Sequence, residues 1–181
     1  MQTIKFGIVV FLLTVLTGTF CAYGQMDKYA AKVVRDPDRS EIMDLIYRYS
    51  HTVDSRDVEG FVSLFIEKCR WAAMLSENAF VLNSRKKLRE YLIERLKYFG
   101  DLNIQTRHVQ TNTLLTRISH DRVSGITYLT LICQVKGEDA PRLVTTGLYK
   151  DVFIKTRSGW KFAIRDAYLD QQGLPTMEPK D

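Results

Sequence analysis

The chain has 181 residues, of which 45% are hydrophobic and 26% are charged, and its formal net charge is +5. This composition is that of a globular protein and excludes intrinsic disorder, and the length favours a single domain. The charge is mild and contains no long run of Lys and Arg, so nucleic acid is not expected as a partner.

The first 24 residues have the pattern of a secretory signal peptide. Lys5 supplies a positive start, residues 6–20 form an uncharged and mostly apolar run, and Ala22-Tyr23-Gly24 offers small residues to a signal peptidase. We expect cleavage before Gln25, export to the periplasm or the medium, and no stable membrane span after processing. A lipoprotein anchored through Cys21 is the less favoured alternative.

Helical periodicity follows a polar leader at residues 25–37. The first helix is expected to begin with Asp38 as its N-cap, because Glu41 lies three residues later, as in a capping box. Its apolar stripe is formed by Ile42, Leu45, Ile46, Tyr49 and Val53. A second short helix is expected over 57–66, and a third begins after a cap at Ser84 and ends at Gly100. Apolar runs at 69–75 and 79–82 predict a hairpin whose turn is Ser76–Asn78.

From residue 104 onward the sequence alternates as strands do. Four long strands are expected over 104–118, 122–136, 142–156 and 159–170, and short turns between them are typical of an antiparallel meander. The fold class is therefore α+β, with three N-terminal helices packed in a strongly curved mixed or antiparallel sheet that forms a cone around an internal pocket. This domain should span 38–171, followed by a flexible tail at 172–181.

The third strand of the meander is apolar on both faces. Val144, Leu148 and Val152 alternate with Tyr149 and Phe153. One face can fill the cone, while the other needs cover to avoid an exposed apolar patch. We therefore expect a homodimer, or less favourably a homotrimer, that associates through the meander.

Residues 105–115 contain the most polar strand face in the domain. Thr106, His108, Gln110 and Asn112 fall on one side of this strand, which is typical of the wall of a pocket, although a solvated face gives the same pattern. Histidine has its ordinary pKa near neutrality and suits proton transfer. Asp54 ends the first helix, where the helix dipole disfavours a carboxylate, so it needs a partner or solvent exposure.

The cysteines and histidines do not form a metal-binding pattern. His51, His108 and His120 lack metal-ligand spacing, so neither a metal nor a cofactor is expected. Cys69 and Cys133 remain after the expected cleavage. They allow either one optional disulfide or two buried thiols.

These residues resemble the nuclear transport factor 2-like superfamily and, within it, the SnoaL-like group. The similarity covers residues 42 to about 169 and rests on four motifs: Ile42…Leu45…Tyr49…Asp54…Asp57, Thr106-Arg107-His108…Asn112, Gly147–Asp151, and Gly159-Trp160…Ile164-Arg165. Scytalone dehydratase and the bile-acid dehydratases of this superfamily are similar in the Asp at the helix end and the His on the strand. The bile-acid enzymes also match Tyr49. The resemblance thus implies catalytic roles for Asp54, His108 and Tyr49.

Other polar groups of those lyases are not matched here. The next strand has Leu131 and Cys133 near the positions that carry an Asp or a second His in them, and the last strand has Asp170 near an Arg position. We expect a cofactor-independent lyase or isomerase, and most simply a dehydratase, acting on a hydrophobic carbonyl compound of the steroid, polyketide or aromatic class. Its substrate-binding residues are expected to be Asn112, Phe61, Leu129, Cys133, Tyr149 and Phe162. The alternative is an exported cavity protein that binds a hydrophobic small molecule without turnover.

Overall fold

The computed structural model describes residues 32–74 and 79–170. Its helices are α2 (Asp38–Asp54), α3 (Val58–Ser63) and α4 (Arg85–Asp101), and its strands are β1 (Phe65–Met74), β2 (Ala79–Leu82), β3 (Ile104–Ser119), β4 (Arg122–Val135), β5 (Arg142–Thr156) and β6 (Gly159–Leu169). The predicted signal peptide, most of the leader, the turn at Ser76–Asn78 and the tail at 172–181 lie outside the described residues. None of the described helices is both long and apolar enough to cross a membrane.

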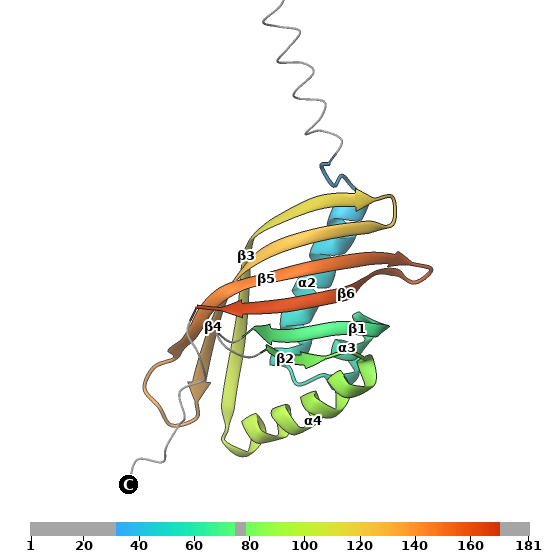
Figure 1. Ribbon diagram of the computed structural model, residues 1–181. Helices are drawn as coiled ribbons and strands as arrows, with labels where there is room; N and C mark the ends of the chain where they lie inside the picture. The colour runs from blue at the N-terminus through green and yellow to red at the C-terminus, as the bar shows by residue number, and fades with distance from the viewer. Residues whose placement is uncertain (1–31, 75–78, 171–181) are drawn as a thin grey trace, which may run out of the picture. The chain divides into compact units, whose positions relative to one another are not determined.

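The strands form one curved mixed sheet in the order β2-β1-β6-β5-β4-β3, as Figure 1 shows. β1 and β6 run parallel, and every other neighbouring pair is antiparallel. The helices α2 and α4 both contact β3 at one end of the sheet, while α2 also contacts β6 and α4 also contacts β1. The sheet therefore bends around the helices without closing on itself, and the predicted α+β cone is confirmed.

The apolar stripe of α2 forms the centre of the core. All five residues of the predicted stripe are buried, as the three- and four-residue spacing requires of a helix that packs on one side. Four phenylalanines from α3 and three strands, each at most 2% exposed, pack in the same cluster: Phe61, Phe65, Phe153 and Phe162. This aromatic layer packs against α2 through the ring of Tyr49.

The start of α2 differs from the predicted capping box. Pro37 is the N-cap residue, and the Asp36 carboxylate accepts the Ser40 backbone N–H at 3.1 Å. The Asp38 carboxylate instead accepts bonds from side chains of β3, β5 and β6, at 2.7 Å from Arg117, 2.7 Å from Lys155 and 3.1 Å from the Trp160 indole. The hydrogen bond from Lys155, with those from Arg117 and Trp160, lowers the pKa of Asp38 to about 2.

The second helix is shorter than predicted because a strand takes its last residues. α3 ends at Ser63, and β1 begins at Phe65. The backbone N–H of Phe162 donates to the Leu64 carbonyl at 2.9 Å, and Phe65 pairs with Phe162. Pairing with a strand nearly one hundred residues away thus overrides local helical periodicity. The predicted cap at Ser84 is confirmed, since its hydroxyl accepts the Lys87 backbone N–H at 3.3 Å.

A bulge in β3 changes which residues face the helices. The register with β4 shifts between Thr111 and Leu114, and Asn112 has a positive φ of 53°. Asparagine is one of the few residues other than glycine that tolerates this conformation, and an extra residue in one strand reverses the inward and outward alternation beyond it. Asn112 is consequently exposed, and Thr113 takes the inner position.

Candidate active site

Polar side chains attach the C-terminal end of α2 to strand β3. The Ser50 hydroxyl donates to the His108 carbonyl at 2.7 Å, and the Gln110 amide donates to the Ser50 hydroxyl at 2.7 Å. One turn further, the Gln105 amide donates to the Asp54 carbonyl at 2.8 Å. The bond from Gln105 satisfies a backbone carbonyl that the helix end leaves without an intrahelical partner, and the three bonds together hold Asp54 against the strand.

The Asp54 carboxylate accepts three hydrogen bonds from this strand. Its Oδ1 lies 2.6 Å from His108 Nδ1 and 2.8 Å from the Thr106 hydroxyl, while Oδ2 accepts the His108 backbone N–H at 2.9 Å. Burial alone would raise the pKa of Asp54, but the hydrogen bonds and charge of His108 outweigh it, so the pKa lies below the ordinary value of 3.8. The partners on β3 therefore offset the unfavourable position of a carboxylate at a helix C-terminus.

The Asp54 bond fixes how His108 can act. An ionised carboxylate only accepts hydrogen bonds, so His108 carries its proton on Nδ1, and Nε2 is the basic nitrogen. The side chains of His108 and Asp54 are 13% and 12% exposed. No described residue donates to or accepts from His108 Nε2, and the imidazole lines a cavity on the concave side of the sheet.

This cavity has a volume of about 390 Å³, near the lower end of the range for small-molecule sites. Helix α4 supplies much of its wall through Leu88, Tyr91, Leu92, Arg95, Leu96 and Phe99, and the sheet supplies Leu129, Leu131, Val144, Ala167 and Leu169. Its polar atoms come from a few side chains, chiefly Tyr49, Thr106, His108, Thr145 and Tyr149. A largely apolar chamber with few polar groups fits a compact hydrophobic ligand.

Two buried tyrosines contact the same buried cation. The Arg165 guanidinium carbon lies 4.1 Å from the ring centroids of both Tyr49 and Tyr149, and Asp151 accepts two bonds from Arg165 at 2.8 Å. Burial, only partly opposed by Arg165, raises the pKa of Tyr49 and of Tyr149. Both phenols therefore stay protonated at neutral pH. The Tyr49 oxygen accepts the Trp71 indole N–H at 3.1 Å, which leaves its own proton available to donate.

A second hollow, of about 570 Å³, lies on the other side of the Asp54–His108 pair. His108 and Asp54 both line it, together with Ser50, His51 and Arg107. The pair therefore separates the apolar chamber from a polar recess. The His108 imidazole is therefore accessible from the apolar chamber and also from the polar recess.

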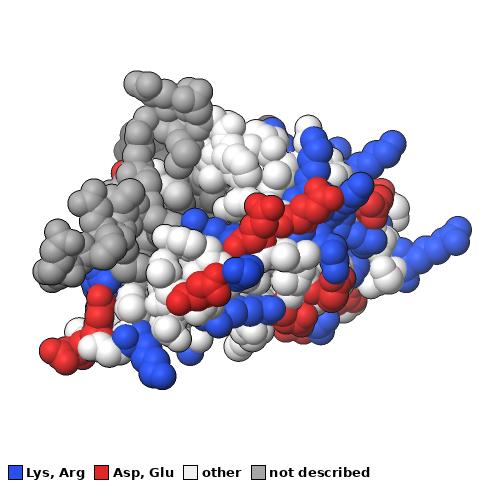
Figure 2. Space-filling view, turned by 90° about the horizontal axis from the view of Figure 1, so that it is seen from below, with Lys and Arg blue, Asp and Glu red and all other residues white. Residues whose placement is uncertain are grey.

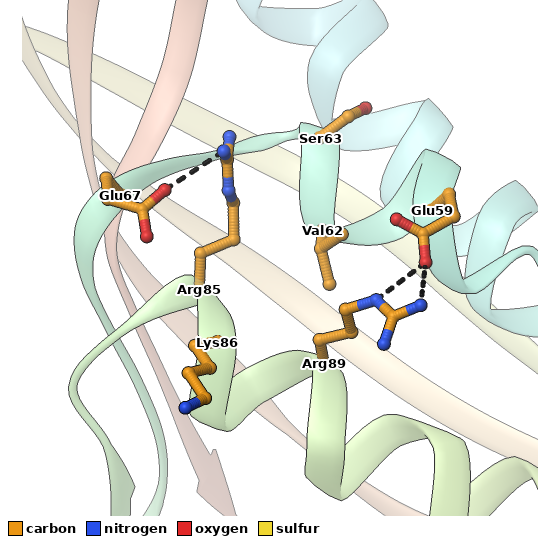
Figure 3. Close-up of a pocket in the computed structure, with 7 residues that line it drawn as sticks. All are labelled: Glu59, Val62, Ser63, Glu67, Arg85, Lys86 and Arg89. Atoms are coloured by element: carbon orange, nitrogen blue, oxygen red, sulfur yellow. Dashed lines mark hydrogen bonds and ion pairs between the residues drawn. The ribbon is translucent and has the colours of Figure 1, made fainter.

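A third hollow, of about 370 Å³, lies between α3, β1 and the start of α4. Figure 3 shows two ion pairs across it, Arg85 with Glu67 at 2.9 Å and Arg89 with Glu59 at 2.6 Å. Most of its lining is charged, and these arginines are already paired with carboxylates. It lacks both the apolar wall and the base that carbonyl chemistry requires.

The structure places the predicted site residues in two groups. Asp54 and His108 meet, and His108, Tyr49, Phe61, Leu129 and Tyr149 line the chamber. Three predicted substrate-binding residues lie elsewhere: Asn112 is turned outward by the bulge, Cys133 packs with Ile104 and Val144, and Phe162 packs in the aromatic core. None of these three lines the chamber.

Sequence reasoning assigned no site role to several residues of the chamber, among them Thr106, Trp71 and Arg95. Thr106 lies two residues before His108 on the same strand face, and this spacing was a usable signal. Trp71 lies on β1, and nothing local in the sequence indicates that it reaches Tyr49. Arg95 is half-buried and lines the chamber, although a charged side chain on a helix usually faces water.

The described residues contain no group of three or more His, Cys, Asp or Glu side chains that could hold a metal ion. Cys69 and Cys133 are both buried as free thiols. Of the two alternatives that the sequence left open, the structure therefore has the thiols and not the disulfide.

The comparisons with known proteins agree with the fold. A family model described as the SnoaL-like domain matches residues 35–166. The chain is similar to a scytalone dehydratase-like protein from Novosphingobium aromaticivorans, with 21% identity, coverage of 74% of this chain and 84% of that chain, and a TM-score of 0.62. It is also similar to ActVI-ORFA from Streptomyces coelicolor, with 21% identity, coverage of 73% and 96%, and a TM-score of 0.64.

A further similar structure is Aln2 from a Streptomyces species, with 17% identity, coverage of 77% of this chain and 95% of that chain, and a TM-score of 0.67. The comparison with curated proteins gives no match. At these identities the solved structures share the fold with this chain, and activity has to be argued from the site itself.

Proposed function

We propose that this chain, which belongs to the family of SnoaL-like domains, is a cofactor-independent lyase or isomerase that moves a proton beside the carbonyl group of a small hydrophobic molecule. Family and fold support a ligand-binding or dehydratase- or isomerase-like role. The observation that carries the finer proposal is the Asp54–His108 pair, joined at 2.6 Å in the wall of the chamber. The N-terminal sequence alone supports the further proposal that the protein acts after export.

The proposed first step is removal of a proton from the carbon next to the substrate carbonyl. His108 Nε2 accepts this proton, and the Asp54 carboxylate stabilises the imidazolium that forms. The electrons of the broken C–H bond move into the carbonyl, which becomes an enolate. The Tyr49 hydroxyl is the proposed donor to the enolate oxygen, in a chamber where exclusion of water strengthens that bond.

The second step decides between a lyase and an isomerase. In a dehydration, His108 returns its proton to a hydroxyl on the β-carbon, the C–O bond breaks, and the enolate electrons form the new C=C bond as water leaves. In an isomerisation, the same proton returns to a different carbon. We favour dehydration because the polar recess that Asp54 and His108 also line offers water a place outside the apolar chamber.

Solvent deuterium exchange tests the proposal without knowledge of the natural substrate. With α-tetralone, a compact bicyclic ketone, the protein is expected to speed exchange of the protons beside the carbonyl in D₂O, as followed by NMR. Loss of water from a panel of aromatic β-hydroxy ketones then separates dehydratase from isomerase. If exchange stays at the rate of buffer while α-tetralone binds, the proton-transfer proposal is wrong.

Binding without turnover is the second candidate, and one observation favours it. Leu131 is the residue opposite His108 on β4 and lines the chamber, so the neighbouring strand supplies an apolar side chain next to the base. A chamber in which the base has an apolar neighbour on the next strand can hold a ligand without completing a reaction. The exchange experiment separates the two candidates directly.

We also propose that two copies of the protein associate through the convex side of the meander. Leu114 and Ile126 are ladder partners, 71% and 42% exposed, and Tyr128 on the same side of β4 is 53% exposed. Neighbouring exposed apolar side chains of this kind favour burial against another protein surface.

Light scattering is expected to give the mass of a dimer, or less favourably a trimer, at micromolar concentration. The Ile126→Lys variant should shift the protein toward monomer, because a charge would be placed in the apolar contact. Tyr98→Lys is the control, since Tyr98 is 50% exposed on α4. A wild-type protein that is monomeric throughout would contradict the association.

A further inference from the structure

Arg95 is a cation in the chamber wall that has no carboxylate partner among the described residues. It is half-buried on α4, and its guanidinium carbon lies 4.5 Å from the centroid of the Phe99 ring. Within residues 32–74 and 79–170, no Asp or Glu makes an ion pair or hydrogen bond with it. The residues three and four positions away on the same helix are Tyr91, Leu92, Tyr98 and Phe99. The helix therefore has no acid at the spacings that allow a side-chain pair with Arg95.

Three other basic residues of the same helix are neutralised by nearby acids. Arg85 pairs with Glu67 at 2.9 Å, Arg89 with Glu59 at 2.6 Å, and Lys97 with Asp101 at 2.8 Å. Figure 2, which views the molecule from the side where α4 lies, shows basic and acidic side chains interspersed rather than gathered in separate fields. Arg95 differs from these residues in facing the chamber.

The described part of the chain places no acid in the chamber wall that could neutralise Arg95. No Asp or Glu is among the described lining residues, and their ionisable groups other than the tyrosines are Arg95 and His108. Two carboxylates that bond to residues of the chamber or contact its tyrosines through Arg165 are already engaged, Asp54 by Thr106 and His108 and Asp151 by Arg165. A cation in a poorly solvated apolar chamber attracts an anion much more strongly than one in water does.

We propose that the substrate carries a carboxylate that Arg95 binds, while the carbonyl of the same molecule is presented to His108. This inference rests on the proposed function, since it assigns a substrate class to the same chamber. The planar guanidinium fork matches a carboxylate in two parallel hydrogen bonds. A carboxylate is favoured over a phosphate ester because one cation balances its single charge, whereas a phosphate carries nearly two. Stacking on Phe99 keeps the guanidinium in place before the ligand arrives.

The test compares two probes of nearly equal shape, β-naphthoate and its neutral analogue β-naphthamide. Their dissociation constants are measured by titration calorimetry. Wild-type protein should bind the naphthoate roughly tenfold more tightly than the amide, the factor expected for one charge-assisted pair. Arg95→Gln should reduce that preference to about twofold or less. Arg89→Gln is the matched control on the same helix, and it should keep the preference because Arg89 is paired with Glu59 outside the chamber.

Each other outcome overturns the assignment. Equal binding of acid and amide by the wild type, or no binding of naphthoate at about 1 mM, excludes a carboxylate site. A preference that survives Arg95→Gln but disappears in His108→Gln places the anion on the imidazole instead. If β-naphthyl phosphate binds more tightly than naphthoate, the ligand of Arg95 is a phosphate and the carboxylate assignment is wrong. Because these are binding measurements, their failure is distinguishable from a failure of proton exchange with α-tetralone.

Discussion

Replacing His108 with alanine is expected to lower the rate of proton transfer by roughly two to four orders of magnitude while leaving the protein folded. The imidazole is the basic group in the chamber wall, so its loss removes the base itself. The fold should survive because Asp54 keeps two donors in the variant, the Thr106 hydroxyl and the backbone N–H of residue 108. Exchange of α-tetralone and a thermal melt of the same sample measure the two effects separately.

Two further variants make this result specific. His108→Gln retains a side-chain donor for Asp54 but has no base, so it should fold like the wild type and be as inactive as the alanine variant. His120→Ala is the control, because the His120 side chain is 93% exposed at the turn between β3 and β4. An alanine variant at 108 that unfolds would make the histidine structural. One that folds and still catalyses exchange would move the chemistry to another residue.

Asp54→Asn should also lose most of the activity, because the neutral amide no longer stabilises the imidazolium. The pH dependence of stability provides an independent readout. The folded-state pKa of Asp54 lies below 3.8, so its stabilising contribution is present above the unfolded pKa and is lost as the pH falls through the folded pKa. Wild type should therefore be more stable than Asp54→Asn at neutral pH, and the difference should disappear in strong acid.

Local patterns made much of the fold and part of the site predictable from the sequence. The stripe of α2, the cap at Ser84 and the long meander depend on residues within a few positions of one another, and all are present in the structure. The polar face around His108 is a local pattern of the same kind. Asp54 was suspected because a carboxylate at a helix C-terminus requires compensation.

The errors arose where distant segments decide local structure. The early start of β1 follows from its pairing with β6 at Phe162, and no periodicity near Phe65 reports that pairing. The outward turn of Asn112 follows from a bulge of one residue, which reverses the strand faces beyond it. Arg95 could not be recognised as a chamber residue, because a charged residue in a helix usually faces water and the chamber between α4 and the sheet exists only in the folded protein.

The buried pair of Arg165 and Asp151 illustrates the same limit. The full burial of their side chains and their direct opposition across β5 and β6 are set by strand register. The guanidinium also contacts the rings of Tyr49 and Tyr149. The ion pair therefore helps to hold Tyr49, the proposed donor to the enolate oxygen, in position. Burial alone would lower the pKa of Arg165, but the Asp151 carboxylate outweighs it and raises the pKa.

Removing only the cation of this pair is expected to be the most damaging single change to stability. Arg165→Met should lower the free energy of unfolding by roughly 3–5 kcal/mol, because it leaves the Asp151 carboxylate buried without a partner. The double variant Arg165→Met with Asp151→Leu should recover most of that loss, since apolar side chains of similar volume replace both charges. Nη1 of Arg165 has no hydrogen-bond partner among the described residues, which further favours the recovery.

Denaturant unfolding monitored by tryptophan fluorescence measures both variants, and Arg70→Met is the matched control. Arg70 pairs with Asp166 on the neighbouring strand at 2.8 Å, but its side chain is 37% exposed, so its loss should cost no more than about 1 kcal/mol. If Arg165→Met costs as little as Arg70→Met, the buried pair does not hold β5 and β6 together. If the double variant is no more stable than the single one, the damage comes from lost packing on the tyrosine rings and not from the unpaired carboxylate.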